Sequence, residues 1–194
     1  MDHWRFYVQG WLLELFGQRA AALDAYQAAL HAKPDFPRAQ NRLAYLFASL
    51  ERFAEAERHF RAVLTAEPGN AVAHFNLGYV HDRRGRFADA IAEFREATRL
   101  NPNIDRAWYG MGLAHARLGQ HDQAATALRE AATLQPMNPH AWYQLGMAYH
   151  SIHQPEKFEE VTMHLLRFDP KMTRRLILDS GRSDLAHLVK DLVA

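Results

Sequence analysis

Cysteine is missing from the sequence. Disulfide bonds, thiolate metal sites, cysteine nucleophiles and the acylated cysteine of a bacterial lipoprotein are therefore excluded. Because disulfides form mainly in oxidising compartments, their exclusion favours a cytoplasmic location. The abundance of Ala and Arg is typical of a bacterial source.

The sequence also has almost no excess of charge of either sign. Its 23 Lys and Arg residues nearly balance its 22 Asp and Glu residues, which gives a formal net charge of +1. Binding to the phosphate backbone of a nucleic acid requires a broad basic face, and this balance does not indicate one. We therefore expect no nucleic-acid partner.

Long hydrophobic runs are missing too. The first eighteen residues are the most apolar stretch, and Gln9, Gly10 and Glu14 interrupt it well before it reaches the length of a membrane span. The same stretch lacks the basic leader and the small-residue cleavage site of an export signal. We expect neither membrane insertion nor export.

Motifs that carry catalysis or cofactor binding are missing as well. The sequence contains no HExxH zinc motif, no GxxxxGK[ST] phosphate loop, no GxSxG nucleophile turn and no CxxC pair. We therefore expect no enzymatic activity, no cofactor and no small-molecule substrate.

The sequence does contain a regular spacing of proline. Apolar residues make up 48% of the chain, enough for a folded core, and five of the eight prolines are each 34 residues from the next. These five are Pro34, Pro68, Pro102, Pro136 and Pro170. Division of the chain at this period gives units that align without a gap, at 3–36, 37–70, 71–104, 105–138 and 139–172.

Small and large residues recur at fixed places within these units. The eighth place holds Gly10, Ala44, Gly78, Gly112 and Gly146, and the twentieth holds Ala22, Ala56, Ala90 and Ala124 before it changes to Phe158. Large residues recur at the twenty-fourth place, as Tyr26, Phe60, Phe94 and Leu128. A glycine inside a helix costs about 1 kcal/mol relative to alanine, so its recurrence implies that two helices approach closely there.

Each unit is predicted to form two amphipathic helices, because its apolar residues are spaced three and four apart. Gly17, Gly85 and Gly119 mark the turn between the two helices of their units. A proline ends each second helix, since the residue before proline disfavours helical geometry. The expected fold is therefore helix, turn, helix, repeated five times.

This pattern resembles the tetratricopeptide repeat over residues 3–172. The residues that carry the resemblance are Trp108, Met111, Gly112, Ala124, Leu128, Ala131 and Pro136 in the fourth unit, and Trp142, Leu145, Gly146 and Tyr149 in the fifth. The resemblance implies an all-α, right-handed superhelical solenoid whose first helices line a concave groove for protein segments. It thus implies a non-catalytic protein-interaction module, such as an adaptor, scaffold or assembly factor.

The last unit departs from the pattern, since Phe158 and Leu165 replace small residues of its second helix. We expect this helix either to stand further out or to pack against something other than a repeat. Residues 173–194 are the candidate for that role, as one or two short capping helices, because a terminal repeat would otherwise expose its core. Their apolar side is predicted to carry Leu185, Leu188, Val189 and Leu192.

The resemblance also places the groove-lining residues, at the second, fifth, ninth and twelfth places of the first helices, with Asn76 added from the sixth place of its unit. These candidates are Tyr7, Trp11, Arg38, Asn41, Tyr45, Phe75, Asn76, Tyr79, Arg106, Tyr109, Tyr143 and Met147. Tyrosine is frequent at protein-contact hot spots, and arginine can bind carboxylates in bidentate fashion. Packing between neighbouring helices is the competing interpretation for any single ring. Tyr45 and Gly110 do not match the residues with which related repeats grip chaperone tails, so we do not expect that activity.

The first helix suggests a second possibility. One apolar stripe holds Trp4, Tyr7, Val8, Trp11 and Leu15, and a second holds Phe6, Leu13 and Phe16. The helix is therefore apolar on more sides than one neighbouring repeat can cover. Homo-oligomerisation through this helix is therefore an alternative function, and a regulatory subunit of a larger complex is another.

Other polar clusters are assigned structural roles. His81 and His115 occupy the same place in adjacent units and are expected to fill packing positions, so no metal site is predicted. The charge runs 51–61 and 93–99 lie on second helices and are expected to form solvated outer faces with ion pairs.

Overall fold

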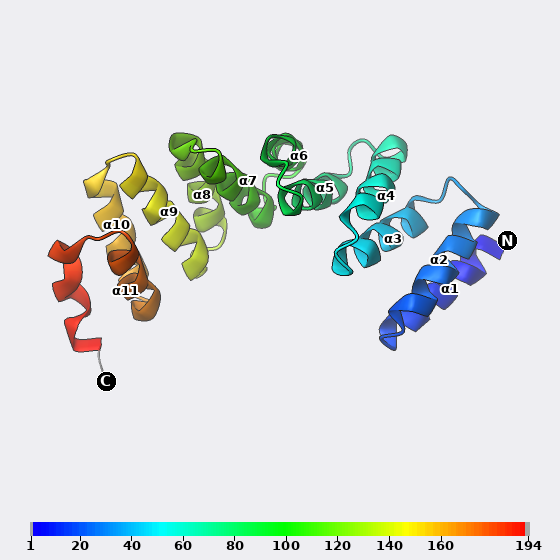
Figure 1. Ribbon diagram of the computed structural model, residues 1–194, viewed down its shortest axis with the longest axis horizontal. Coiled ribbons are helices and arrows are strands. Elements are labelled where there is room, and N and C mark those ends of the chain that lie inside the picture. The colour runs from blue at the N-terminus through cyan, green and yellow to red at the C-terminus, as the bar shows by residue number, and fades with distance from the viewer. Residues whose placement is uncertain (1, 193–194) are drawn as a thin grey trace. The chain divides into compact units, whose positions relative to one another are not determined.

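The computed structural model describes residues 2–192, and over these residues every regular element is a helix (Figure 1). The α-helices are α1 (Asp2–Leu15), α2 (Arg19–Ala32), α3 (Pro37–Ser49), α4 (Phe53–Ala66), α5 (Ala71–Arg83), α6 (Phe87–Leu100), α7 (Asp105–Arg117), α8 (His121–Leu134), α9 (Pro139–Ser151), α10 (Pro155–Leu166) and α11 (Pro170–Asp179), followed by the 3₁₀ helix η1 (Ser183–Leu192). The prediction of an all-α chain built from tandem helix-turn-helix repeats is confirmed.

The chain divides into two compact units, Met1–Leu100 and Asn101–Ala194. The first holds α1 to α6, and its principal core cluster lies between the helices of successive repeats, with Tyr26, Phe47 and Phe60 fully buried. The second holds α7 to η1, and its core runs from Ala124 on α8 to Leu176 on α11.

The expected close approach of paired helices occurs where glycine recurs. A Cβ atom added to Gly78 on α5 would lie 2.8 Å from the ring of Phe94 on α6, and one added to Gly112 on α7 would lie 2.6 Å from Leu128 Cγ on α8. Both distances are shorter than side chains tolerate, so the large residue of the second helix occupies the space that glycine leaves on the first.

The turn between paired helices uses the left-handed backbone region in every repeat. Gly17, Gly85 and Gly119 have φ values of 74°, 74° and 72°. The sequence does not mark the other two turns, where Glu51 and His153 adopt φ values of 58° and 55° although they carry side chains. The repeat therefore imposes this backbone conformation even where glycine is absent.

A hydrogen bond also recurs between repeats. The Nε1 atoms of Trp108 and Trp142 donate to the carbonyl oxygens of Pro102 and Pro136, over 2.8 and 2.9 Å. His74 Nε2 lies 3.1 Å from the carbonyl oxygen of Pro68 in the same relationship. In these three units, the fourth place thus connects the start of the first helix to the proline that ends the preceding repeat.

The charge run 51–61 is not wholly a solvated face, which corrects the sequence-based expectation. Glu57 on α4 is only 5% exposed and accepts hydrogen bonds from Arg84 and Arg86 in the following repeat. Burial opposes ionisation of Glu57, but the hydrogen bond from Arg86 and the charges of Arg61 and Arg86 outweigh it and lower its pKa. The run therefore contains an ion-pair network that joins two repeats.

The C-terminal cap packs on the fifth repeat. Phe158 and Leu165 of α10 are fully buried, and Leu176 of α11 covers Gly146, 2.8 Å from where a Cβ would lie. Along η1, Leu185 and Leu188 are half-buried and Val189 is buried. The side chain of Leu192 lies outside the residues described. Residues beyond α10 thus bury the end of the array, as a solenoid requires.

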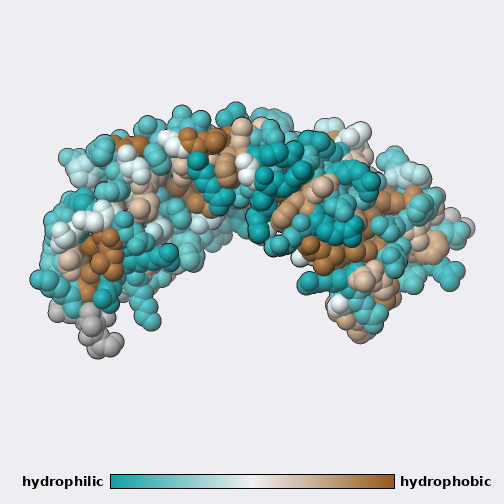
Figure 2. Space-filling model, viewed as in Figure 1, coloured by the Kyte–Doolittle hydropathy of each residue, from teal (hydrophilic) through white to brown (hydrophobic). Residues whose placement is uncertain are grey.

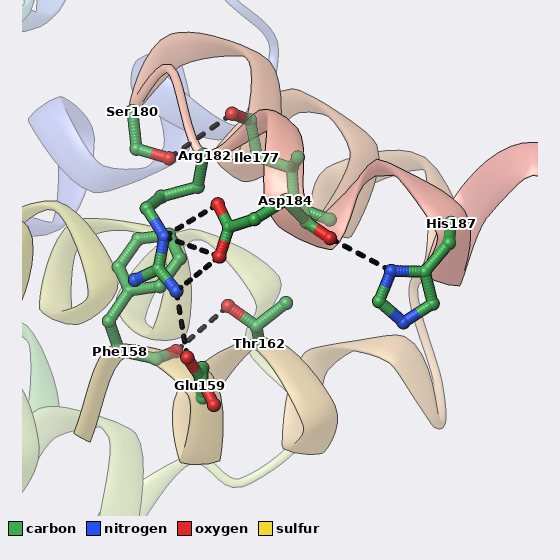
Figure 3. Close-up of polar contacts among 8 residues, drawn as sticks. All are labelled: Phe158, Glu159, Thr162, Ile177, Ser180, Arg182, Asp184 and His187. Carbon is green, nitrogen blue, oxygen red and sulfur yellow. Dashed lines mark hydrogen bonds and ion pairs between the residues drawn. The ribbon is translucent and has the colours of Figure 1, made fainter. Parts of the chain in front are cut away.

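Arg182 connects this cap to α10 (Figure 3). Its guanidinium lies over the Phe158 ring, 5.2 Å from the centroid, and its Nη2 donates to Glu159 over 2.7 Å and to Asp184 over 2.7 Å. The hydrogen bonds that Arg182 donates to these two carboxylates are the main cause that raises the pKa of Arg182. One side chain thus ties the α11–η1 turn to the fifth repeat.

Candidate functional site

Three of the predicted groove residues meet in a pocket of the first unit. The pocket has a volume of about 210 Å³ and lies among α3, α4 and α5. The pocket is lined by Tyr45, Ala48, Ser49, Phe60, Asn76 and Tyr79. We call it the Asn76 pocket. Tyr45 and Tyr79 occupy the same place on the first helices of successive repeats, which is why the fold brings them to one pocket.

Asn76 lines the pocket and carries an unsatisfied hydrogen-bond donor. The residue is only 6% exposed, and its Nδ2 atom has no hydrogen-bond partner among the described residues. A buried donor left unsatisfied is unfavourable by about 1–3 kcal/mol, so such groups are rare in native structures. An acceptor that reached this atom would remove this penalty.

Aromatic rings form the floor and rim of the Asn76 pocket. Phe60 is buried beneath it, and the exposed Tyr45 ring packs edge-on against Phe60, with centroids 6.0 Å apart. Tyr79 is exposed on the opposite helix, α5. The pocket therefore combines apolar contact area with one buried amide, a combination typical of ligand-binding pockets.

Arg83 extends the rim of the site, although the sequence did not single it out. Its Nη1 donates to the Tyr79 hydroxyl over 3.1 Å, and its guanidinium lies 5.4 Å from the Phe53 ring centroid. Its Nη2 lies 3.4 Å from Glu51 Oε1 on the α3–α4 turn. The four-residue spacing between Tyr79 and Arg83 indicates that these two side chains can meet on one helix face. The contact with Glu51 depends on the left-handed backbone conformation of Glu51 in that turn.

The other predicted groove residues of the first unit lie apart from this pocket. Tyr7 is half-buried and packs against Tyr26, with ring centroids 5.6 Å apart, and against Phe36 at 5.3 Å. The remaining positions are Trp11 and Arg38, both exposed, and Asn41 and Phe75, both half-buried. The Arg38 guanidinium lies over the Trp4 ring at 5.3 Å.

In the second unit, the predicted residues do not line one pocket. Arg106 is exposed, Tyr109 and Met147 are half-buried, and both of the latter pack against the core. The Tyr143 hydroxyl already donates to Asp179 Oδ2 on α11 over 2.6 Å, and burial together with this bond raises the pKa of Tyr143. The capping helix thus uses a side chain that the sequence assigned to partner binding.

The first helix leaves a continuous apolar stripe exposed. Trp4, Val8, Trp11 and Leu15 of α1 are all exposed, and their spacing of four, three and four residues places them on one side of the helix. Figure 2 shows hydrophobic patches, in brown, on the face in view over the part of the chain that holds α1 to α4. An exposed stripe of this kind is a feature of protein contact surfaces.

Histidines serve the packing, as the sequence indicated. His81 is buried beside Arg86, whose Nη2 lies 2.6 Å from its Nδ1, and burial lowers its pKa. His115 is buried and its Nδ1 lies 2.7 Å from Gln120 Oε1.

Over residues 2–190, whose side chains are described, no three His, Cys, Asp or Glu side chains converge as metal ligands. In the same part of the chain, no helix has both the length and the apolarity that a membrane crossing needs.

Comparisons with known proteins agree with this architecture. Family models described as tetratricopeptide repeat match residues 7–71, 47–105, 75–136, 109–153 and 139–172. No curated protein sequence matches the chain. Such repeats generally act as protein-interaction modules and are typically non-catalytic.

Solved structures share the fold at low sequence identity. A crystal structure of MamA aligns with a TM-score of 0.81 and 19% identity, covering 91% of this chain and 94% of that one. YrrB, described as a TPR protein with an unusual peptide-binding site, aligns with a TM-score of 0.79 and 22% identity, covering 91% and 90%. A MamA fragment from Desulfovibrio magneticus RS-1 aligns with a TM-score of 0.79 and 18% identity, covering 86% and 94%.

Proposed function

Because the chain belongs to the tetratricopeptide repeat family, we propose that it is a non-catalytic adaptor or assembly factor that holds a segment of a partner protein in the Asn76 pocket. We further propose that it acts in the bacterial cytoplasm and that its five repeats divide at residues 36, 70, 104 and 138, with a cap from 173.

The unsatisfied Nδ2 of Asn76 is the observation that carries this proposal. In an extended protein segment, backbone carbonyls project sideways while alternate side chains face the binding surface. One carbonyl could accept from Asn76 while one side chain enters the pocket. The volume of about 210 Å³ suits a single apolar side chain, with Phe60 as its floor and Tyr45 at the rim.

Binding of peptides tests the proposal. A displayed library of random peptides is selected on the wild-type protein, and the recovered peptides are titrated by calorimetry against wild type and Asn76→Asp, which keeps the size of the side chain but removes the donor. We expect about tenfold weaker binding to Asn76→Asp, which corresponds to about 1.4 kcal/mol. Asn103→Asp makes the same charge change at an exposed loop position and is expected to bind as wild type does. Equal affinity for Asn76→Asp and wild type would contradict the proposal.

The exposed stripe of α1 supports a second candidate function, homo-oligomerisation through this helix. Burial of Trp4, Val8, Trp11 and Leu15 against a second copy would remove them from water, at a gain of about 25 cal/mol per Å² of apolar area. Light scattering at 10–100 µM, roughly the range where weak association appears, is expected to give a mass above one chain that falls with Trp11→Glu. A strict monomer over this range would exclude this second function.

A further inference from the structure

Arg83 stands at the edge of the Asn76 pocket with its guanidinium held in place. It lies one helical turn after Tyr79 on α5, and its Nη1 donates to the hydroxyl of that pocket-lining ring. Its charged group also lies 5.9 Å from the centroid of the Tyr79 ring and 5.4 Å from that of Phe53. Two aromatic rings and one hydroxyl thus orient the cation beside the pocket.

The charge of Arg83 is only weakly compensated. Its side chain is 44% exposed, and that of its partner Glu51 is 73% exposed. The 3.4 Å between Arg83 Nη2 and Glu51 Oε1 exceeds the usual length of about 2.7–2.9 Å for a charge-assisted hydrogen bond. Exposed pairs of this kind contribute about 0–1 kcal/mol, so another carboxylate can compete for the guanidinium.

Two neighbouring arginines differ from Arg83 in this respect. Arg84 and Arg86 both donate to Glu57, a carboxylate that is buried between repeats. Replacing that carboxylate would leave a buried charge unpaired, which is strongly unfavourable. Of these three cations, Arg83 alone combines exposure, a long ion pair and contact with a pocket residue.

We infer that the site selects an extended partner segment in which an acidic residue lies beside the apolar residue that enters the Asn76 pocket. The acidic side chain pairs with Arg83, whose planar guanidinium can bind a carboxylate through two parallel N–H donors. This inference rests on the proposed function, because it names the chemistry of the segment that the Asn76 pocket holds.

The experiment selects the same random peptide library on wild type and on Arg83→Glu. We expect wild type to enrich Asp or Glu beside an apolar residue, and Arg83→Glu to enrich Lys or Arg at that place. Arg95→Glu is the matched control, since Arg95 is exposed on α6 and does not line the pocket. It is expected to keep the acidic preference of wild type.

Titration of single peptides then separates electrostatic recognition from a structural role of Arg83. In wild type, exchange of the acidic residue for Gln should weaken binding about three- to fivefold, and this loss should shrink in Arg83→Glu. It should also shrink in Arg83→Met, which removes the charge but keeps an unbranched apolar side chain. Thermal unfolding of both variants checks that the repeat remains folded.

Three results would overturn the inference. If the acidic residue and Gln bind wild type equally, or if Arg83→Glu keeps the acidic preference, the inference fails while the dependence on Asn76 leaves the proposed function intact. If no selected peptide depends on Asn76, the proposed function fails and the inference fails with it.

Discussion

Gly112 and Leu128 lie so close together that a Cβ atom on Gly112 would be 2.6 Å from Leu128 Cγ. The backbone oxygen of Ala124 would lie only 3.3 Å from that Cβ atom. The space beside Gly112 is therefore closed both by a side chain and by backbone. This contact between α7 and α8 is the large-to-small packing on which the register of the repeat depends.

Substitution of Gly112 by Leu should destabilise the second unit by about 1–3 kcal/mol, because overpacking forces the two helices apart. Even Gly112→Ala should not give the gain of about 1 kcal/mol that alanine gives in an open helix position. Urea denaturation measures both effects. Gly69→Ala is the control, since a Cβ there meets nothing within 4 Å. Unchanged unfolding of Gly112→Leu would mean that the helices do not approach as described.

His153→Gly should stabilise the protein. His153 holds φ at 55° in the turn where three other repeats have glycine. A side chain in the left-handed region is unfavourable by about 1–2 kcal/mol, and glycine removes most of this strain while it adds freedom to the unfolded chain. We expect a gain of about 0.5–1 kcal/mol, measured by thermal unfolding. Gly119→Ala should shift stability in the opposite direction, and a loss in both variants would contradict this account of the turn.

Acid should weaken the protein in part through His59. This residue is buried on α4, its Nδ1 lies 2.5 Å from Gln40 Oε1, and burial lowers its pKa from 6.5 to about 4. The folded state therefore disfavours the protonated ring that the unfolded state accepts below pH 6.5. The contribution of neutral His59 to the free energy of unfolding is fully present above pH 6.5 and is lost progressively as the pH falls toward 4.

Urea denaturation of wild type and His59→Gln at pH 7 and pH 4.5 measures this effect. Wild type should lose about 2 kcal/mol more than the variant over this range. His31→Gln, at an exposed position on α2, should follow wild type. Equal losses in wild type and His59→Gln would show that His59 does not carry the dependence.

Arg182→Ala should lower the local stability of η1 in the C-terminal cap. The change removes the hydrogen bonds to Glu159 and Asp184 and the contact with the Phe158 ring (Figure 3). Hydrogen exchange of the η1 amides should accelerate about fivefold or more, which corresponds to a local loss of about 1 kcal/mol. Arg175→Ala, which removes another arginine from the cap, should affect η1 less. Equal exchange of η1 in wild type and Arg182→Ala would argue against this role.

The sequence predicted the helices because they depend on local periodicity. Regular prolines and the glycine at the eighth place fixed the register, and Tyr45 and Tyr79 followed from it as equivalent places on neighbouring first helices. Contacts that join different repeats could not be read in this way. Glu57 in a charge run became a buried ion-pair partner, because Arg84 and Arg86 reach it from the next repeat.

The same limit explains the contacts that the sequence did not predict. Tyr143 occupies a predicted groove place, and its hydroxyl donates to Asp179 of α11, which packs against α9. Arg83 and Glu51 meet because the α3–α4 turn adopts a left-handed conformation without glycine. Such geometry depends on packing that no short pattern encodes.

The side-chain amide of Asn76 offers the most direct test of partner binding in the Asn76 pocket. Its resonances, assigned in ¹⁵N-labelled protein by comparison with Asn76→Asp, are followed by NMR while a selected peptide is added. A new hydrogen bond to a peptide carbonyl predicts a downfield shift of one amide proton and slower exchange with water, both saturating with the peptide affinity. Unchanged Asn76 resonances at saturating peptide would contradict the account.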